Sequence, residues 1–157
     1  MCSSDLDPSI LPYLQKRLGL SSEQLVGVLD TESGLVGLAG RPGNPTELLA
    51  DPAPASQFAV ELYCYRLRKY IGAFCAVLGG CDGIVFGGGV GEHSPEVRAR
   101  ALEGMDWAGI ELDAAANGAA RGTEAAIQSA SSKVRVQVIP VDEEVVMVRG
   151  AAGVIGR

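Results

Sequence analysis

The sequence has little of what a metal centre, a disulfide framework or a nucleic-acid surface requires. It contains one histidine, and its four cysteines form no Cys-x-x-Cys pair, so neither a zinc site nor a disulfide scaffold is indicated. We interpret these cysteines as reduced thiols, buried or without a role. Lysine and arginine number 13 against 19 aspartates and glutamates, which gives a net charge of -6. This balance argues against nucleic acid or an anionic membrane surface as a partner.

Long apolar runs are absent as well. No window approaches the run of roughly 18 apolar residues that a membrane span needs, and the N-terminus lacks the basic and apolar blocks of a signal peptide. We therefore expect no membrane association and a cytoplasmic location. What the sequence does have is 47% hydrophobic and 20% charged residues, a composition typical of one soluble globular domain with a real core. The composition leaves open a protein that binds or converts a small molecule.

Local patterns in the first half predict mostly helices. Residues 7–29 predict two short helices, the second capped by Ser21 with Gln24 at the capping-box spacing. Residues 33–55 carry several prolines among glycines and predict a long loop with little regular structure. Residues 55–78 predict a helix. We expect its core-facing stripe to consist of Tyr63, Leu67, Tyr70, Phe74 and Val77.

The second half predicts strands that alternate with helices. Residues 83–86, GIVF, form a short β-branched run, which predicts a buried strand. In residues 133–140 every second residue from Val134 to Val138 is a valine, which predicts a strand with one buried face. A closing helix is predicted to begin near Asp142. The order of helices and strands favours an α/β layer arrangement.

The stretch IVFGGGVGEHSPEVRARAL, residues 84–102, joins a predicted strand to a predicted helix through a cluster of glycines. Ser94 suits an N-cap, Pro95 the first helical position and Glu96 the first turn. Such a loop presents unpaired backbone N–H groups at the positive end of a helix dipole, which is a ready anion site. Glycines after a strand equally serve a tight turn without any ligand, because they tolerate positive φ and close packing.

Two common phosphate-binding loops do not match this stretch. A Walker loop requires a lysine directly after its last glycine, and no lysine follows here. The dinucleotide pattern Gly-x-Gly-x-x-Gly can begin at Gly87 and Gly89, but Glu92 then stands at its last position. The glycine cluster by itself therefore leaves the ligand open.

A longer string, GIVFGGGVGEHSPEVRARALEGMDWAGIELDAAAN at residues 83–117, resembles the C-terminal domain of the acetokinase family of acetate, propionate and butyrate kinases. Four further motifs resemble the family in the same order along the chain, so the likeness extends from Asp7 to the C-terminus. They are DLDPSILPYL, SGLVGLAG, YRLRKYIGAFCAVLGGCDGIVF and VQVIPVDEEVVMVR. Several collinear motifs at family spacing are far more specific than one glycine pattern.

The resemblance implies a fold and an activity. The fold would be a ribonuclease-H-like domain of the actin, Hsp70 and sugar-kinase superfamily, an α/β fold with a mixed sheet flanked by helices. Two such domains close on a nucleotide in this family, and residues 7–157 would be the second. The complete protein would transfer a phosphoryl group reversibly between ATP and acetate, giving acetyl phosphate and ADP with Mg²⁺ or Mn²⁺ as charge clamp. A homodimer that pairs through this domain is also implied.

The resemblance also assigns site residues. Those placed at the adenosine and phosphates of the nucleotide are Gly88, Gly89, Val90, Gly91, Glu92, His93, Asn44, Pro45 and Thr46. Glu143 matches the magnesium-associated carboxylate of the family. An acid at a helix N-terminus can hold a water of a hydrated Mg²⁺, and the helix dipole alone would also explain an acid there.

Three departures from the family pattern bear on activity. His93 stands where the family has an asparagine, and residues 44–46 replace an Asp, an apolar residue and an Arg, so they offer no planar cation to stack on the base. Cys2 stands where the family has a catalytic Arg, and the resemblance places most other catalytic groups and the acyl pocket in a first domain. We therefore expect residues 7–157 alone to be inactive, and the short-chain carboxylate to bind together with that first domain.

The first six residues suggest a reason for the departure at Cys2. Met1 to Leu6 match one reading frame of a widely used sequencing adapter, and we expect them to be a non-native leader joined to a truncated gene. Two functions from different classes then stay open. One is the C-terminal half of an acetate kinase, and the other is a stand-alone module that binds nucleotide or dimerises without catalysis.

Overall fold

The structure is a computed structural model that describes residues 7–142 together with Val145, Val148, Ala151 and Ala152. The chain divides into two compact units, Met1–Ala59 and Val60–Arg157, here called the first and the second unit. The division falls inside helix α5 (Pro54–Leu78). Among the described residues, none of the helices is both long enough and apolar enough to cross a membrane.

The first unit is helical. It contains α1 (Ile10–Leu18), α2 (Ser22–Gly27), the π-helical turn η1 (Val28–Glu32), α3 (Gly34–Ala39), α4 (Pro45–Leu49) and the start of α5. The two predicted helices at its beginning are confirmed. So is the capping box, because the Gln24 backbone N–H donates to Ser21 Oγ at 3.2 Å and the Ser21 N–H donates to Gln24 Oε1 at 2.8 Å.

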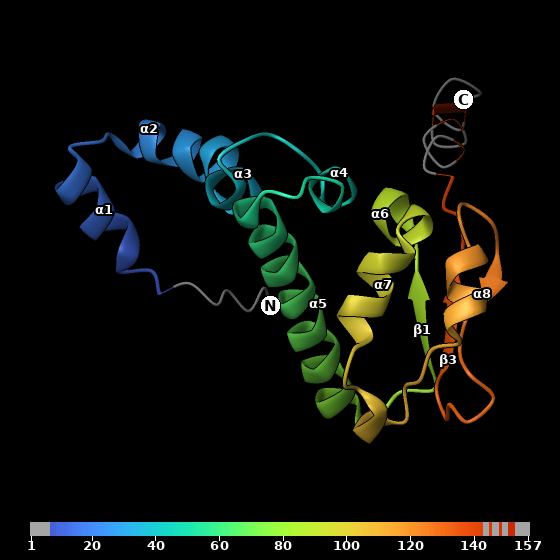
Figure 1. Cartoon of the computed structure of the whole chain (residues 1–157). Coiled ribbons are helices and arrows are strands. Elements are labelled where there is room, and N and C mark those ends of the chain that lie inside the picture. The colour runs from blue at the N-terminus through green and yellow to red at the C-terminus, as the bar shows by residue number, and fades with distance from the viewer. Residues whose placement is uncertain (1–6, 143–144, 146–147, 149–150, 153–157) are drawn as a thin grey trace. The chain divides into compact units, whose positions relative to one another are not determined.

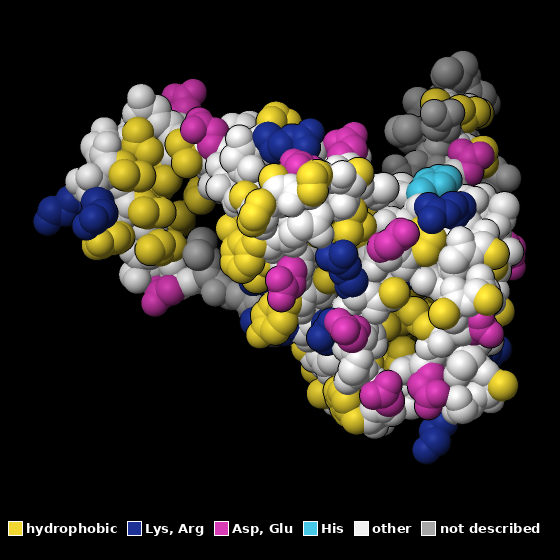
Figure 2. Space-filling view, viewed as in Figure 1, with side chains coloured by type: hydrophobic (Ala, Val, Ile, Leu, Met, Phe, Trp, Pro, Cys, Tyr) yellow, Lys and Arg dark blue, Asp and Glu magenta, His cyan; other side chains and the backbone are white. Residues whose placement is uncertain are grey.

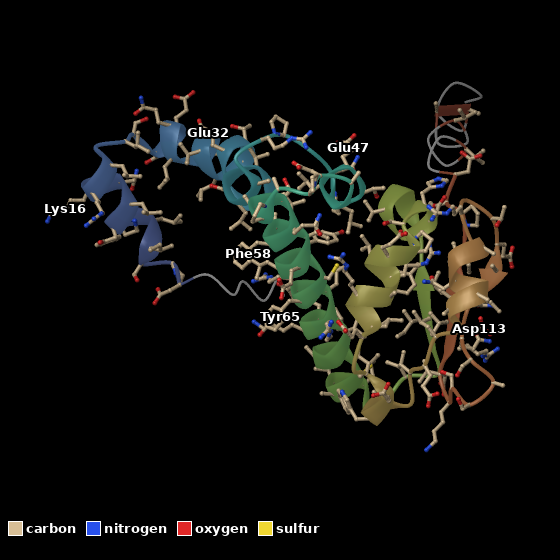
Figure 3. All side chains as sticks on the ribbon, viewed as in Figure 1. Lys16, Glu32, Glu47, Phe58, Tyr65 and Asp113 are labelled. Atoms are coloured by element: carbon tan, nitrogen blue, oxygen red, sulfur yellow. The ribbon has the colours of Figure 1, made fainter. Side chains whose placement is uncertain are left out.

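The prediction of a long loop at residues 33–55 is wrong, because α3 and α4 lie inside it. Asn44 is the N-cap of α4, and its Oδ1 accepts from the N–H groups of Thr46 and Glu47 at 2.9 and 3.0 Å. Figure 3 labels Glu47 on α4, where its carboxylate accepts in return from the Asn44 N–H at 3.0 Å. Pro45 occupies the first helical position, where the missing N–H costs no bond and the fixed φ favours the helix. A proline in this segment can therefore mark the start of a helix, as Pro45 does, as well as an interruption of regular structure.

Helix α5 confirms the helix predicted at residues 55–78, but the predicted core stripe is wrong. Phe74 and Val77 are 62% and 82% exposed. The buried positions of this helix in the second unit are instead Val60, Cys64 and Cys75. Val60 and Cys64 are four residues apart, and Cys64 and Cys75 are eleven apart. At this spacing the three side chains share one face of the helix, and the predicted aromatic stripe lies on another. Small side chains let the helix approach its neighbours closely. The size of the aromatic side chains therefore did not predict which residues of α5 are buried.

The second unit holds a three-stranded mixed sheet of order β1-β3-β2. β1 (Gly83–Phe86) pairs in parallel with β3 (Arg135–Val138), with Phe86 opposite Val138, and β2 (Ala125–Ala126) pairs antiparallel with β3. Figure 1 shows β1 and β3 side by side, with α7 and α8 packed near them. The predicted α/β class with a mixed sheet flanked by helices is confirmed at this level.

The predicted burial of side chains is confirmed for β3 but not for β1. β3 has the predicted buried face, since Val134, Val136 and Val138 are at most 3% exposed. β1 is a strand as predicted, but Val85 is 58% exposed, so the expectation of a fully buried strand is wrong. Other fully buried core side chains in this unit are Met105, Ile110 and Ile127.

The remaining elements of the second unit follow β1 in sequence. They are α6 (Gly88–His93), α7 (Pro95–Leu102), the 3-10 turn η2 (Asp106–Ala108) and α8 (Ala114–Ala119). Asp113, labelled in Figure 3, caps α8 by accepting from the Ala116 N–H at 2.8 Å. The closing helix predicted from Asp142 lies largely outside the described residues. Its described members are helical, and the Val145 N–H donates to Asp142 Oδ1 at 3.0 Å, as expected of an N-cap.

Candidate functional site

The glycine segment begins where β1 ends. Gly87 is extended and is the N-cap of α6, so the predicted loop is in fact the first turn of a six-residue helix. α7 then begins at Pro95, with Glu96 in its first turn, as predicted. Because β1 and β3 are parallel, their carboxyl ends meet at one edge of the sheet. The Ile139 N–H donates to the Phe86 carbonyl there at 3.0 Å, so the residues after β3 run beside the start of the glycine segment.

The glycines of this segment have different reasons to lack a side chain. A Cβ on Gly87 would lie 2.8 Å from Cγ2 of Val141, and one on Gly91 would lie 3.4 Å from the backbone of Phe86. Gly88 has φ +72°, a left-handed conformation that favours glycine. Gly89 has neither feature, because a Cβ there would meet nothing within 4 Å and its φ is not positive. Close packing therefore accounts for Gly87 and backbone conformation for Gly88, whereas a Cβ on Gly91 would make only an ordinary van der Waals contact and Gly89 has no internal reason to be glycine.

Glu92 ties the glycine segment to the residues after β3. Its side chain is buried, at 8% exposure. One oxygen, Oε1, accepts from the N–H groups of Gly88 and Val141, each at 2.8 Å. A carboxylate at the start of α6 is also favoured by the helix dipole. The carboxylate thus serves the protein's own backbone, and a nucleotide contact by Glu92 stays a prediction.

Arg98 on α7 holds the other end of α6, and the sequence reasoning missed it. It is fully buried. Its Nη1 donates to the carbonyls of Gly91 and Glu92 at 2.6 and 3.1 Å. Its Nη2 donates to the carbonyls of Asn117 and Ala120 at 2.9 and 2.6 Å, and its Nε to Asn117 Oδ1 at 2.8 Å. One cation therefore fastens the last turn of α6 to α8.

The charge of Arg98 has no carboxylate among these partners. Burial lowers the pKa of its guanidinium from the ordinary value, and the neighbouring Arg121 cation lowers it further. An arginine nevertheless stays protonated in proteins. A signal for its role was present in the sequence, since Arg98 shares a face of α7 with the buried Ala101 and Leu102. A lone cation in an apolar stripe is rarely buried unless it is fully hydrogen-bonded.

His93 ends α6 and is exposed on the surface of the second unit (Figure 2). Its ring lies against Gly122, where an added Cβ would collide with Cε1 of the imidazole. The Gly122 N–H donates to the Glu92 carbonyl at 3.1 Å, and Arg121 Nη1 donates to the His93 carbonyl at 3.3 Å. The turn at residues 121–122 is therefore docked on the end of the predicted nucleotide segment. It adds the Arg121 cation, which the sequence analysis did not consider.

The other predicted site residues are distributed over the two units. Asn44, Pro45 and Thr46 belong to the first unit, at the start of α4, and Asn44 Oδ1 is engaged in capping that helix. Gly88 to His93 belong to the second unit. Glu143 lies outside the described residues. Within the described part of the chain, no three His, Cys, Asp or Glu side chains are grouped so that they could hold a metal ion.

One sizeable cavity in the second unit is not this site. It measures about 460 Å³ and is lined by both acidic and basic residues, among them Arg100, Glu103, Asp106 and Glu111. No residue of α6 lines it. Chemistry at the carboxyl edge of the sheet is the stronger candidate, because backbone amides, two buried charges and an unexplained glycine converge there.

Comparison with known proteins gives one consistent result. A family model described as "Acetokinase family" matches residues 1–149. An acetate kinase of Solibacter usitatus is 40% identical over 151 residues, which cover 94% of this chain and 36% of that protein. An acetate kinase of Methylocella silvestris is 44% identical over 144 residues, covering 92% and 35% respectively. The chain thus spans little more than a third of the length of these relatives.

Solved structures agree. The crystal structure of an acetate kinase from Porphyromonas gingivalis is 33% identical and superposes with a TM-score of 0.86, over 98% of this chain and 39% of that one. A propionate kinase from Francisella tularensis is 27% identical, with a TM-score of 0.78 over 90% of this chain and 36% of that one.

Proposed function

Because this chain belongs to the acetokinase family, we propose that it is the nucleotide-binding part of an acetate kinase. The complete protein would transfer a phosphoryl group reversibly between ATP and acetate, giving acetyl phosphate and ADP. We assign residues 7–157 to its C-terminal nucleotide-binding and dimerisation domain. We also assign the ribonuclease-H-like fold of the actin, Hsp70 and sugar-kinase superfamily. The parallel pairing of β1 with β3 and the glycine segment at their carboxyl edge support both assignments.

Gly89 is the observation that carries the proposal. A side chain at this position would point into open space and would not strain the backbone. Helix propensity would favour alanine there by roughly 0.5–1 kcal/mol. A bound nucleotide supplies the missing reason for glycine, because phosphate oxygens accept hydrogen bonds from the first-turn amides of a helix and need a close approach to the backbone.

The buried charges around Gly89 would prepare this backbone for the nucleotide. Glu92 fixes the Gly88 N–H and Arg98 fixes the carbonyls at the end of α6, so the segment is held before any ligand arrives. His93, exposed at the end of α6, would flank the adenine. By resemblance to the family, Asn44, Pro45 and Thr46 are also proposed as adenosine contacts.

Magnesium would enter with the nucleotide. In the proposed site Glu143 would hold a water of a hydrated Mg²⁺ or Mn²⁺, which would supply positive charge beside the phosphates. Glu92 contributes indirectly, because its bond to the Val141 N–H anchors the chain two residues before Glu143. The acetate or other short-chain carboxylate would be bound largely by residues that precede this domain in the complete protein.

We propose that a second copy of the chain pairs with this domain. The second unit exposes Tyr65, Phe74, Val77 and Leu78 on α5, each more than half exposed. Burying apolar side chains of this size is the main driving force of association between subunits.

A titration with Mg-ATP tests the proposed site. The unmodified chain is expected to bind, Gly89→Val to lose binding and Gly89→Ala to bind more weakly, because each places a side chain in the path of the phosphates. The unfolding free energy of Gly89→Ala should be unchanged or higher by up to about 1 kcal/mol. Isothermal titration calorimetry and urea unfolding measure the two effects.

Gly118→Ala is the matched control. Gly118 also lies in a short helix, α8, where a Cβ would meet nothing within 4 Å, so its substitution should leave Mg-ATP binding unchanged. Undiminished binding by Gly89→Val would sink the placement of the site.

A further inference from the structure

Two cysteines of the second unit lie sulfur to sulfur. Cys75 is in the last turn of α5, and Cys81 stands two residues before β1. Their Sγ atoms are 3.4 Å apart, with the Cys75 thiol donating to Cys81, and both are free thiols. The sequence spacing shows no familiar redox motif, so the pair becomes visible only in the fold.

A cavity gives small molecules access to this pair. It measures about 180 Å³, and its lining includes Cys75, Cys81 and Trp107. Cys75 is 8% exposed, while Cys81 is half-buried. Trp107 is 75% exposed and is the only tryptophan of the chain. Both cysteines therefore line a cavity that also borders an exposed side chain.

We propose that Cys75 and Cys81 form a reversible disulfide by exchange with small disulfides such as oxidised glutathione. The Cys81 thiolate attacks one sulfur of the small disulfide and displaces its other half as a thiolate. The Cys75 sulfur then attacks Cys81 in this mixed disulfide and releases the second half. In total the two cysteines lose two protons and two electrons, and the small disulfide gains them as two thiols.

The local backbone permits the bond. The sulfur atoms must approach from 3.4 Å to the roughly 2.05 Å of a disulfide. The connecting turn contains Gly79 and Gly80, at φ +74° and +126°, with open space around each. Glycines in such a turn adjust at little steric cost. The disulfide would tie the end of α5 to the entry of β1.

Cys64 provides the contrast within the same unit. It is 2% exposed, and its thiol donates to the Val97 carbonyl at 3.9 Å rather than to another sulfur. Cys64 should keep its thiol under conditions that oxidise the pair, and it serves as the control position.

Exchange should quicken with pH. Burial raises the pKa of the Cys81 thiol to about 11. The thiolate is the attacking species, so its fraction, and with it the rate, should rise about tenfold per pH unit below that pKa.

Mass spectrometry of the full chain tests the proposal. After equilibration with oxidised and reduced glutathione, the tryptic peptide from Tyr70 to Arg98, which contains both cysteines and no other, should lose the mass of two hydrogen atoms. It should also resist alkylation until it is reduced. Trp107 fluorescence should fall on oxidation and recover with dithiothreitol.

Variants and unfolding separate the proposal from incidental oxidation. Cys75→Ser and Cys81→Ser should each abolish the loss of two hydrogens, and Cys64→Ser should leave it unchanged. The equilibrium constant for the disulfide should be at least about tenfold larger in the folded chain than in urea, because the fold holds the sulfurs together. A folded wild-type chain that stays reduced, or that forms the bond no better than the unfolded chain, would overturn the proposal without any variant.

Discussion

At the scale of single residues, two buried charges explain how a glycine-rich segment becomes a helix. α6 has six residues, three of them glycines, and isolated helices this short are unstable. Glu92 accepts from an N–H at its start, and Arg98 donates to two carbonyls at its end. These are the backbone groups that a helix leaves without internal partners. The opposite charges of the two side chains match the two ends of the helix dipole.

Arg98→Leu should therefore destabilise the chain strongly. The change leaves the carbonyls of Gly91, Glu92, Asn117 and Ala120 without their donor, and unpaired buried polar groups cost about 1–3 kcal/mol each. We expect a loss of at least about 3 kcal/mol in the unfolding free energy, measured by urea titration. Arg100→Leu, on the same helix but partly exposed, should cost no more than about 0.5 kcal/mol. Equal losses for the two variants would contradict the role given to Arg98.

Residue roles were predictable where the partner is a sequence neighbour. Pro95 at the first position of α7 and Glu96 in its first turn were foreseen. Ser94 is the N-cap as predicted, but its buried Oγ makes no capping bond and has no partner in the described part of the chain. Arg98 bonds to residues up to 22 positions away, which local spacing cannot show.

At the scale of elements, local signals found the helices and strands better than their buried faces. The capping box of α2 was predictable because it joins residues three apart, and the valines of β3 were predictable because they alternate along one strand. α3 and α4 were missed, since prolines and glycines were taken only as breakers. The buried face of α5 was predicted wrongly because the small side chains of Cys64 and Cys75 are buried there, while the larger Phe74 is exposed. Burial depends on how closely neighbours approach, which is a property of the fold.

The start of α5 in the first unit should respond to acid. Asp51 accepts from the Ala53 N–H at 3.0 Å, Ser56 Oγ at 2.7 Å and Arg41 Nη1 at 3.0 Å. These bonds, the Ala53 one first, lower the pKa of the Asp51 carboxyl from 3.8 to about 2. A carboxyl with a lowered folded-state pKa stabilises the fold above its unfolded pKa and loses this effect as pH falls through the folded value.

Asp51→Asn should therefore be less stable than the wild type near neutral pH. The difference in unfolding free energy should shrink as pH falls from about 4 to about 2, where the wild-type carboxyl also becomes neutral. Urea unfolding followed by circular dichroism at several pH values measures it. A difference that stays constant down to pH 2 would show that charge at Asp51 does not stabilise this helix start.

At the scale of the whole molecule, the sequence was most informative through the order of its motifs. Five collinear motifs predicted the acetokinase family, and the match over residues 1–149 confirms it. The candidate site could be predicted only as a set of residues. The members in the second unit are held by two buried charges, Glu92 and Arg98, which act through contacts between segments remote in sequence. The chain spans little more than a third of the length of the acetate kinases that it matches, so the activity of a whole kinase stays a proposal.

Acetyl phosphate formation by a completed protein is the most direct test of the proposed function. Residues 7–157 would replace the matching C-terminal part of the Solibacter usitatus acetate kinase, and the product would be trapped with hydroxylamine. We expect ATP- and acetate-dependent acetyl phosphate formation, which Gly89→Val should abolish and Gly118→Ala should leave intact. A folded joined protein that binds Mg-ATP as tightly as the parent kinase yet forms no acetyl phosphate would contradict the proposed function, and would favour a module that binds nucleotide without catalysis.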